Sequence, residues 1–228
     1  MVAKIITVAN QKGGAGKTTL AMQLAGTLAL RGKRVLVVDG DKQGSATRWA
    51  ANADDDSSFP AQVVNLAEAG KTIHREVRRF LKDFEIIVID CPPSVESPIP
   101  QSALVVSDIA LIPIIPSPND FWATRGIKQL IEHAQAVNEA LQAFLVPNMC
   151  QMNTNLAQEI LELLEDFGLP LFPVSLHLRT GYRESAGYGQ TVHIFRSKQR
   201  EAISEIERLT DQLERILEHH QTEILENV

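Results

Sequence analysis

The stretch NQKGGAGKTT, residues 10–19, indicates the fold more strongly than any other part of the chain. The common phosphate-binding loop reads G-x-x-x-x-G-K-[ST], and residues 16–18 match the end of that pattern. The first glycine of the pattern is replaced by Gln11, and the loop instead has glycines at 13–14, preceded by Lys12. The sequence therefore predicts a phosphate-binding loop with a second cation, whose role the remaining sequence has to explain.

Glycines and a hydroxyl give this loop the groups that a bound nucleotide needs. Without a Cβ, Gly13, Gly14 and Gly16 allow backbone N–H groups to face phosphate oxygens, and the following helix directs its positive end at the same place. Lys17 is expected to reach the β- and γ-phosphates, and the hydroxyl of Thr18 is expected to bind Mg²⁺. The predicted ATP contacts in the loop are Lys12, Gly13, Gly14, Ala15, Gly16, Lys17, Thr18 and Thr19.

Short β-branched segments alternate along the chain with segments of helical length. Continuous apolar strands of this kind are typical of a parallel sheet that helices cover on both faces. Strands are expected at 4–10, 34–39, 62–67, 85–90, 109–115, 143–149 and 171–176. Helices are expected at 17–31, 71–82, 120–139, 155–167 and 197–220. The sequence thus predicts one α/β domain over residues 1–228, a P-loop NTPase fold with a mostly parallel twisted sheet, with helix 197–220 packed on it or extending from it.

The composition is that of an ordinary globular protein. The chain has 228 residues, of which 44% are hydrophobic and 22% charged, and a net charge of −6. Cys91 and Cys150 are too few for a disulfide framework, and no charged-then-apolar leader precedes VAKIITVAN. No apolar run approaches the ~20 residues of a membrane-spanning helix. A cytoplasmic protein is expected, and its negative charge limits any nucleic-acid surface to a local basic patch.

Acidic residues follow two of the expected strands. Asp39 ends the second strand and Asp41 comes two residues later, while Asp90 ends the fourth strand in EIIVID. The carboxyl ends of parallel strands meet at one edge of the sheet, where ligands bind, and the glycine-rich loop lies at the same edge. An acid after four apolar residues is typical of the strand that holds the water shell of magnesium. Carboxylates this close need a cation or water to share.

Three stretches in order, KGGAGKTT (12–19), VDGDKQGS (38–45) and IDCPP (89–93), resemble the ParA/MinD family of deviant Walker ATPases. Two further stretches, PIIPSPNDFW (113–122) and LRTGYRESAGYGQTV (178–192), resemble the short, ParF-like branch of ParA proteins. That branch lacks an N-terminal DNA-binding domain. The resemblance covers essentially the whole chain.

The resemblance implies a role for each part of the nucleotide site. In this family the additional lysine, here Lys12, crosses a subunit interface to the phosphates of the partner's ATP, so that a sandwich homodimer holds two nucleotides. The implied catalytic residues are Lys12, Lys17 and Asp41, and Asp41 orients the attacking water. Thr18, Asp39 and Asp90 match the positions that hold Mg²⁺ or its waters.

The resemblance also bears on the rate of ATP hydrolysis and on the residues that contact adenine. The family commonly has proline after the second Asp, where this chain has Lys42, a departure beside the residue that positions the water. Hydrolysis is expected to be slow and stimulated by a partner, because a switch needs a long-lived ATP state. Asn148, after the sixth strand, and Pro113 or Pro116 are the expected adenine contacts.

Members of the short ParA branch cover the nucleoid through non-specific DNA contacts of the ATP dimer. They move a cargo that bears a stimulating adaptor protein of the ParB or ParG type. The resemblance therefore implies a cytoplasmic, nucleoid-associated ATPase that segregates a plasmid, a chromosome or a large protein cargo. Helix 71–82 is also basic and is interpreted as an ordinary exposed face. The predicted DNA contacts are Arg179, Arg183, Arg196, Lys198 and Arg200.

Two alternatives share the loop and the fold. A MinD-like spatial regulator needs a basic amphipathic C-terminal helix for anionic lipid, whereas residues 197–228 have eight acids and four Lys or Arg residues. No membrane contact is therefore expected. A metabolic P-loop synthetase of the same fold needs substrate-binding residues that the sequence does not reveal. Lys12 favours the positioning ATPase over the synthetase.

Overall fold

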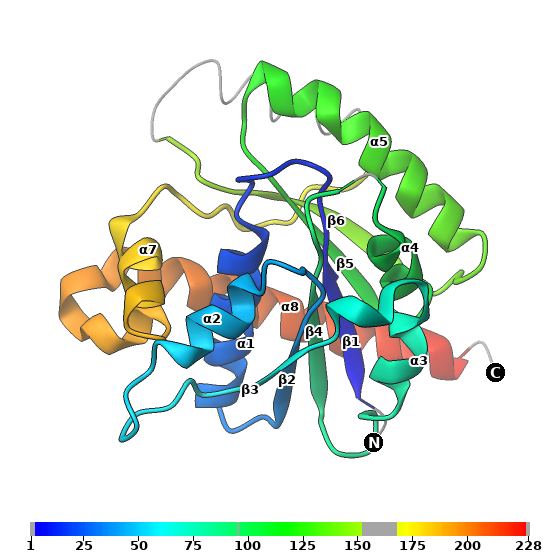
Figure 1. Cartoon of the computed structure of the whole chain (residues 1–228). Coiled ribbons are helices and arrows are strands. Elements are labelled where there is room, and N and C mark those ends of the chain that lie inside the picture. Colours follow the sequence, from blue (N-terminus) through cyan, green and yellow to red (C-terminus); the bar gives the residue numbers. More distant parts are fainter. Residues whose placement is uncertain (1–2, 95, 152–167, 227–228) are drawn as a thin grey trace.

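The centre of the protein is one parallel sheet (Figure 1). The computed structural model describes residues 3–94, 96–151 and 168–226, and within them six strands join in the order β3-β2-β4-β1-β5-β6. All five neighbouring pairs are parallel, which confirms the predicted α/β class. The strands are β1 (Lys4–Val8), β2 (Val35–Asp39), β3 (Gln62–Asn65), β4 (Ile86–Asp90), β5 (Ile109–Ile114) and β6 (Gln142–Pro147).

Helices cover both faces of this sheet. One layer packs on the face formed by Ile6, Val37 and Val88, and consists of α1 (Lys17–Leu30), α2 (Ser45–Ala51), α7 (Thr180–Gly187) and α8 (Arg200–Glu226). The other layer packs on the face formed by Ile5, Val38 and Ile87, and consists of α3 (Ile73–Arg78), α4 (Pro98–Leu104) and α5 (Pro118–Gln135). Short 3₁₀ segments, η1 (Ala67–Thr72) and η2 (Val192–Gln199), precede α3 and α8.

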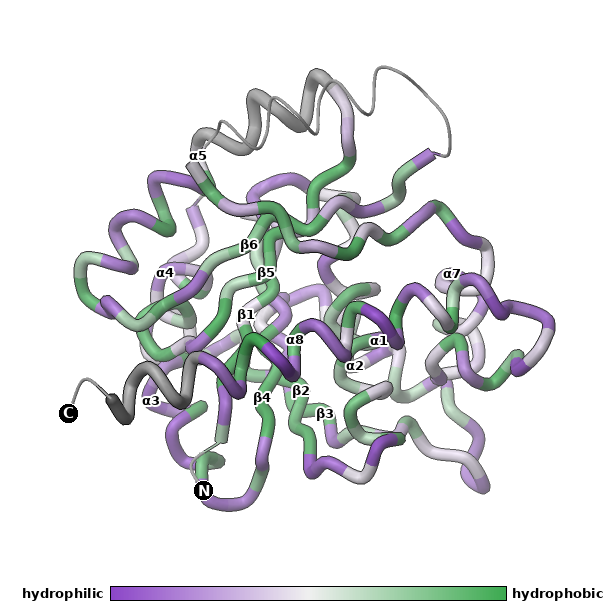
Figure 2. The backbone as a smooth tube through the Cα atoms, turned by 180° about the vertical axis from the view of Figure 1, so that it is seen from behind, coloured by the Kyte–Doolittle hydropathy of each residue, from purple (hydrophilic) through white to green (hydrophobic). Residues whose placement is uncertain are grey.

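The apolar runs of the sequence follow from this burial on both faces. In β4, Ile86 and Val88 join one core, and Ile87 and Ile89 join the other, because successive side chains of a strand point to opposite faces. In the coloured part of the backbone, Figure 2 shows hydrophobic strands in the middle of the molecule and many hydrophilic residues at its periphery. In the described part of the chain, no helix is both long and apolar enough to cross a membrane.

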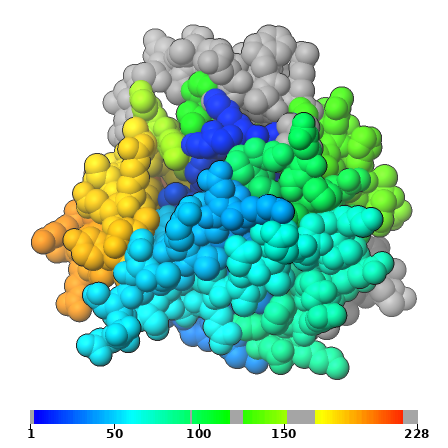
Figure 3. Space-filling view, viewed as in Figure 1, coloured from blue at the N-terminus to red at the C-terminus, as the bar shows by residue number. Residues whose placement is uncertain are grey.

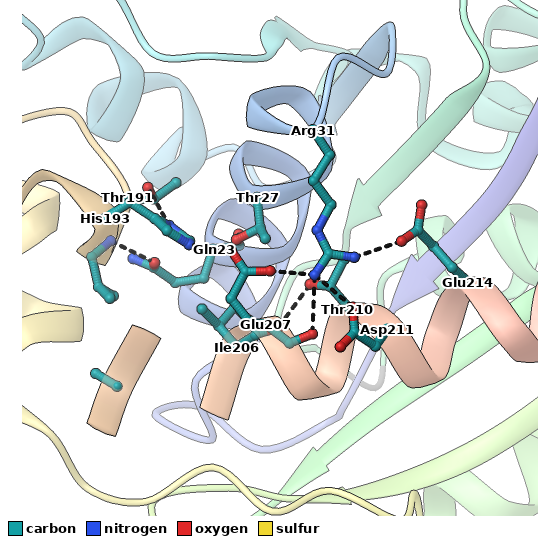
Figure 4. Close-up of polar contacts among 12 residues, drawn as sticks. Gln23, Thr27, Arg31, Thr191, His193, Ile206, Glu207, Thr210, Asp211 and Glu214 are labelled. Atoms are coloured by element: carbon teal, nitrogen blue, oxygen red, sulfur yellow. Dashed lines mark hydrogen bonds and ion pairs between the residues drawn. The ribbon is translucent and has the colours of Figure 1, made fainter. Parts of the chain in front are cut away.

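Helix α8 packs along α1, and its charge pattern serves that contact. An apolar stripe on α8 is buried, whereas acids on a neighbouring stripe surround Arg31 at the end of α1 (Figure 4). Arg31 pairs with Glu207, with Asp211 at 2.7 Å and with Glu214 at 2.6 Å. Burial lowers the pKa of this guanidinium, but the three carboxylates outweigh it and raise the pKa above its ordinary value. The buried stripe consists of Ala202, Ile206, Leu209, Leu213 and Leu217.

The predicted seventh strand, 171–176, is wrong. The segment runs beside β6 and forms one isolated bridge with it, Leu171 with Leu145, while His177 just after the segment bridges with Cys150 beyond the end of β6. Leu145 donates to the carbonyl of Pro170 at 2.9 Å, and Phe172 donates to the carbonyl of Leu145 at 2.7 Å. A continuous ladder cannot form because proline has no N–H to donate, and prolines occur on both sides, at 147 and 173.

The helices also differ in extent from the expected ones. The predicted helix 71–82 is reduced to α3, with the end of η1 before it and a turn at 79–82 after it. The helix expected at 197–220 begins at Arg200 and reaches Glu226. Its start is delayed because η2 occupies Val192–Gln199, with Arg196 in a left-handed conformation at a φ of 47°. Helices α2, α4 and α7 were not expected. The helix predicted at 155–167 lies outside the described residues.

Candidate nucleotide-binding site

The glycine-rich loop connects β1 to α1 and lies at the carboxyl end of the sheet. Gly14 and Gly16 have φ values of 78° and 86°, in the left-handed region where residues with a Cβ are strained. Asn10, 6% exposed, holds the start of the loop. Its Nδ2 donates to the carbonyl of Pro113 at 2.7 Å, and its Oδ1 accepts the N–H of Lys12 at 3.1 Å.

Lys17 occupies the interior of the loop. Its side chain is 6% exposed, and Nζ donates to the carbonyl of Lys12 at 2.9 Å. Burial lowers its pKa, while the negative charges of Asp90 and Asp41 oppose that shift. A cation held in this way is poorly solvated, and the negatively charged oxygens of a phosphate would stabilise it in place of water. Lys12 is half-buried.

Two strands bring the predicted magnesium residues together. Asp39 and Asp90 are register partners on neighbouring strands β2 and β4. The hydroxyl of Thr18 donates to Oδ2 of Asp90 at 2.7 Å, whereas Oδ1 of Asp90 is buried and has no hydrogen-bond partner among the described residues. Burial raises the pKa of Asp90 to about 7. A buried carboxylate oxygen beside a hydroxyl and a second carboxylate suits Mg²⁺ and its waters, so these residues fit the metal.

The carboxylates of Asp39 and Asp41 accept hydrogen bonds from the β2–α2 loop and from the start of α2. Asp39 accepts the N–H of Asp41 at 3.1 Å, and also accepts the N–H and hydroxyl of Thr47 at 2.9 and 2.8 Å. Asp41 accepts the N–H of Gln43 at 2.9 Å through one carboxylate oxygen. Lys42, at the position of the family proline, is 73% exposed and pairs with Glu68 on η1 at 3.3 Å. Its ammonium is therefore engaged outside the loop.

The expected adenine contacts lie close to the loop. Asn148 is 5% exposed, and its Nδ2 donates to the carbonyl of Ala15 at 2.8 Å. A Cβ on Gly16 would lie 2.3 Å from that nitrogen, so the loop and Asn148 are in close contact. Pro113 is buried within β5, and its carbonyl is taken by Asn10. Adenine binding by Asn148 and Pro113 stays a prediction.

The glycine-rich loop and the β2–α2 loop border a cavity of about 290 Å³ at the surface. Figure 3 shows the glycine-rich loop, in dark blue, reaching the surface directly above the β2–α2 segment. Gly14, Lys17, Thr18 and Asp41 line the cavity, and so does Met149. Met149 has a φ of 51° and no sequence pattern indicates it, whereas Gln43 and Ser45, which also line the cavity, belong to the VDGDKQGS stretch.

Two larger cavities, of about 390 and 560 Å³, lie at the opposite end of the strands. They are lined by the starts of β1 and β5 in one case and of β2 and β3 in the other. Neither has a glycine-rich loop or paired carboxylates among its described lining residues. Chemistry rather than volume therefore identifies the nucleotide site.

The predicted DNA contacts gather around α7 and η2, but they are not equivalent. Arg179 pairs with Glu201 and, at 2.8 Å, with Glu205, which is 4% exposed at its side chain. Its charge is therefore largely compensated inside the protein. The remaining candidates are exposed: Arg183, Arg196, Lys198 and Arg200. The basic residues on α3 and beside it are exposed too, as the sequence suggested: Lys71, Arg75, Arg78, Arg79 and Lys82.

The fold and the loop define a P-loop nucleotide-binding domain, in which a buried lysine, a hydroxyl and two carboxylates meet at the carboxyl end of a parallel sheet. The chain belongs to the CobQ/CobB/MinD/ParA nucleotide-binding domain family, which matches residues 6–192.

Named relatives cover much of the chain. The maintenance of carboxysome distribution protein A of Halothiobacillus neapolitanus is 31% identical over 208 residues, which covers 91% of this chain and 95% of the relative. The sporulation initiation inhibitor protein Soj of Bacillus subtilis is 33% identical over 201 residues, covering 70% of this chain and 78% of Soj.

Solved structures share the fold. The ATP complex of a Cyanothece McdA variant has a TM-score of 0.75 and 16% identity, and covers 92% of this chain and 96% of that one. The septum site-determining protein MinD of Pyrococcus horikoshii, complexed with Mg-ADP, has a TM-score of 0.74 and 17% identity, and covers 96% and 98%. Structures that match this fold therefore hold ATP, or ADP with magnesium.

Proposed function

We propose that this protein is a positioning ATPase that binds ATP with Mg²⁺, forms a sandwich homodimer, binds DNA non-specifically and moves a cargo with an adaptor protein. The observation that carries this proposal is the arrangement of two lysines in one loop. Lys17 fills the interior of the loop, and the carbonyl of Lys12 is its hydrogen-bond partner. The backbone of Lys12 thus contacts Lys17 inside the loop, and the half-buried Lys12 side chain is the cation proposed to reach a partner subunit's phosphates in a sandwich dimer.

Each residue of the site has a task in this mechanism. The backbone N–H groups of the loop and Lys17 bind the phosphates and neutralise their charge. Thr18, Asp39 and Asp90 would hold Mg²⁺, which when bound offsets the negative charge of the β- and γ-phosphates. Asp41 lines the cavity and, with one oxygen tied to Gln43, would orient the attacking water with the other. Turnover is slow without an adaptor in this proposal.

DNA binding depends on dimerisation in this account. Each subunit contributes the exposed cations around α7 and η2, and the affinity for DNA rises steeply with the number of phosphates that are neutralised. A monomer offers half of them. The dimer therefore binds to the nucleoid in the cytoplasm while it holds ATP, and hydrolysis releases it.

We propose a large protein assembly, rather than a plasmid or a chromosome, as the cargo. The support is the relative named for carboxysome distribution, because it aligns with 91% of this chain, whereas Soj aligns with 70%. Cross-linked purification of the ATP-bound Asp41→Ala protein from its own cells tests this. Proteins of an assembly together with a small adaptor are expected, and a DNA-site-binding partition protein alone would contradict the choice of cargo.

Lys12→Ala tests the function directly. The variant should bind ATP with near wild-type affinity, because Lys17, Thr18 and the loop N–H groups remain, yet it should stay monomeric and lose DNA binding at physiological salt. Sizing and a DNA mobility assay with ATP, with ADP and without nucleotide measure both properties. Lys33→Ala is the matched control, because Lys33 is an exposed lysine at the opposite end of the sheet. A monomeric Lys12→Ala protein that holds DNA as tightly as wild type would refute the proposal.

A further inference from the structure

One buried amide joins the nucleotide-binding helix to the segment that carries the proposed DNA contacts. Gln23 lies on α1, six residues after Lys17, and is 1% exposed. Its Nε2 donates to Oγ of Ser185 on α7 at 2.8 Å, and its Oε1 accepts the N–H of Val192 at 2.9 Å. A buried amide destabilises a fold unless it is hydrogen bonded, and here both of its ends are used.

The helix and this segment are in direct contact. A Cβ on Gly26 of α1 would lie 2.2 Å from Cγ2 of Thr191, which is 1% exposed. Only glycine permits so close an approach at this place. Figure 4 shows Gln23 on α1 next to Thr191 and His193, and the ring of His193 is in turn bonded to Glu207 of α8 at 2.7 Å. The segment therefore packs directly on α1.

Helix α2, which begins beside the predicted magnesium residue Asp39, contacts the same segment. Nε1 of Trp49 donates to the carbonyl of Gln190 at 3.1 Å. At the start of α2, Thr47 donates twice to Asp39, at 2.9 and 2.8 Å. Both helices that start at the nucleotide site thus form hydrogen bonds with residues 185–192.

The cations of the segment flank these anchors. Arg183 lies on α7, and Arg196 and Lys198 lie on η2, all exposed. The φ of 47° at Arg196 is a conformation that a non-glycine residue keeps only when its surroundings hold it. The spacing of the cations therefore depends on how the segment is anchored.

We infer that Gln23 is a positioning residue through which the nucleotide at the start of α1 sets the arrangement of residues 183–198. Phosphates bind the N-terminal turn of α1, and a helix moves as a unit, so a shift at Lys17 reaches Gln23 about 9 Å along the axis. The purpose of the linkage, control of DNA binding, rests on the proposed function, whereas the linkage itself does not.

Hydrogen exchange of the wild type and of Gln23→Met tests the linkage. Methionine keeps the length and apolar stem of the side chain and removes both hydrogen bonds. Exchange of the amides of 183–198 is compared between a non-hydrolysable ATP analogue and ADP. The ratio of the two rates should be at least fivefold in wild type and below twofold in Gln23→Met, with the affinity for the analogue unchanged within twofold.

Two further variants make the result decisive. Ser185→Ala removes one of the two hydrogen bonds, should give an intermediate ratio, and decides the matter if Gln23→Met does not fold. Ser107→Ala removes a buried hydrogen bond with Thr7 away from the segment and should keep the wild-type ratio. Equal exchange with both nucleotides in wild type, or a wild-type ratio in the Gln23 and Ser185 variants, overturns the inference.

DNA binding measured on the same samples separates the inference from the proposed function. A nucleotide-dependent exchange ratio that needs Gln23, without any DNA binding, would overturn the proposed function and leave the linkage standing. ATP-dependent DNA binding with an exchange ratio that ignores Gln23 would do the reverse. If both are right, the ratio of the DNA affinities with the ATP analogue and with ADP falls at least tenfold in Gln23→Met, while ATP-induced dimerisation persists.

Discussion

Asp90 is a fully buried carboxylate, and Asp90→Asn measures what its burial does to stability. Burial raises its pKa to about 7; the hydrogen bond from Thr18 opposes the rise, Asp39 adds to it and Lys17 opposes it. In the unfolded chain the same side chain is exposed and its pKa is about 3.9. Between these two values the folded protein holds a proton on Asp90 that the unfolded chain has released.

The sign of the pH effect follows from that proton. The folded state binds the proton of Asp90 more tightly than the unfolded chain does. The stabilisation from this protonation is therefore fully present below pH 4 and is lost as the pH rises through 7. From pH 5 to pH 8 this loss amounts to about 2.5 kcal/mol for a pKa that changes from about 3.9 to about 7. For a chain of this length the loss corresponds to about 5–10 °C in melting temperature. Asparagine does not titrate, so Asp90→Asn lacks this part of the pH dependence.

The assay is urea or thermal unfolding of both proteins at pH 5, 6, 7 and 8, in EDTA and without nucleotide. The change in stability with pH is compared between the proteins, which cancels the pH-independent cost of burying an amide. Asp56→Asn, at an exposed acid outside the site, is the matched control and should follow wild type. At pH 8, Mg-ATP should stabilise wild type and not Asp90→Asn. Equal losses of stability in wild type and Asp90→Asn between pH 5 and pH 8 would refute the reasoning.

The remaining predictions concern the nucleotide. Lys17→Ala should reduce ATP affinity at least a hundredfold in an equilibrium titration, because the phosphates lose the buried cation of the loop. Near-normal affinity would show that this loop does not bind the phosphates. Asp41→Ala should keep ATP affinity, slow turnover at least tenfold and accumulate the dimer with ATP, because the water loses the group that orients it. A purely monomeric Asp41→Ala protein in sizing with ATP would contradict that role.

Local patterns are enough to predict the parts of the site that lie within one segment. The sequence places residues 12–19 after a strand and at the start of a helix, as the structure has it. This is possible because a phosphate-binding turn needs its glycines and lysine within one short stretch of backbone. The alternation of apolar strands and helices predicts a parallel sheet, which in turn predicts that Asp39 and Asp90 meet at one edge. Their pairing as register partners on β2 and β4 confirms this.

Contacts that do not follow from the order of the strands were decided only by the tertiary structure. The hydrogen bond from Asn148 to Ala15 joins residues 133 positions apart, and that of Gln23 with Val192 joins residues 169 positions apart. Arg179 carries a charge in the sequence like any surface arginine, yet Glu205 compensates it in the fold. The period of a helix or strand tells which residues share a face, but not which other segment covers that face. For that reason the nucleotide loop could be read from the sequence, whereas its connection to the basic segment could not.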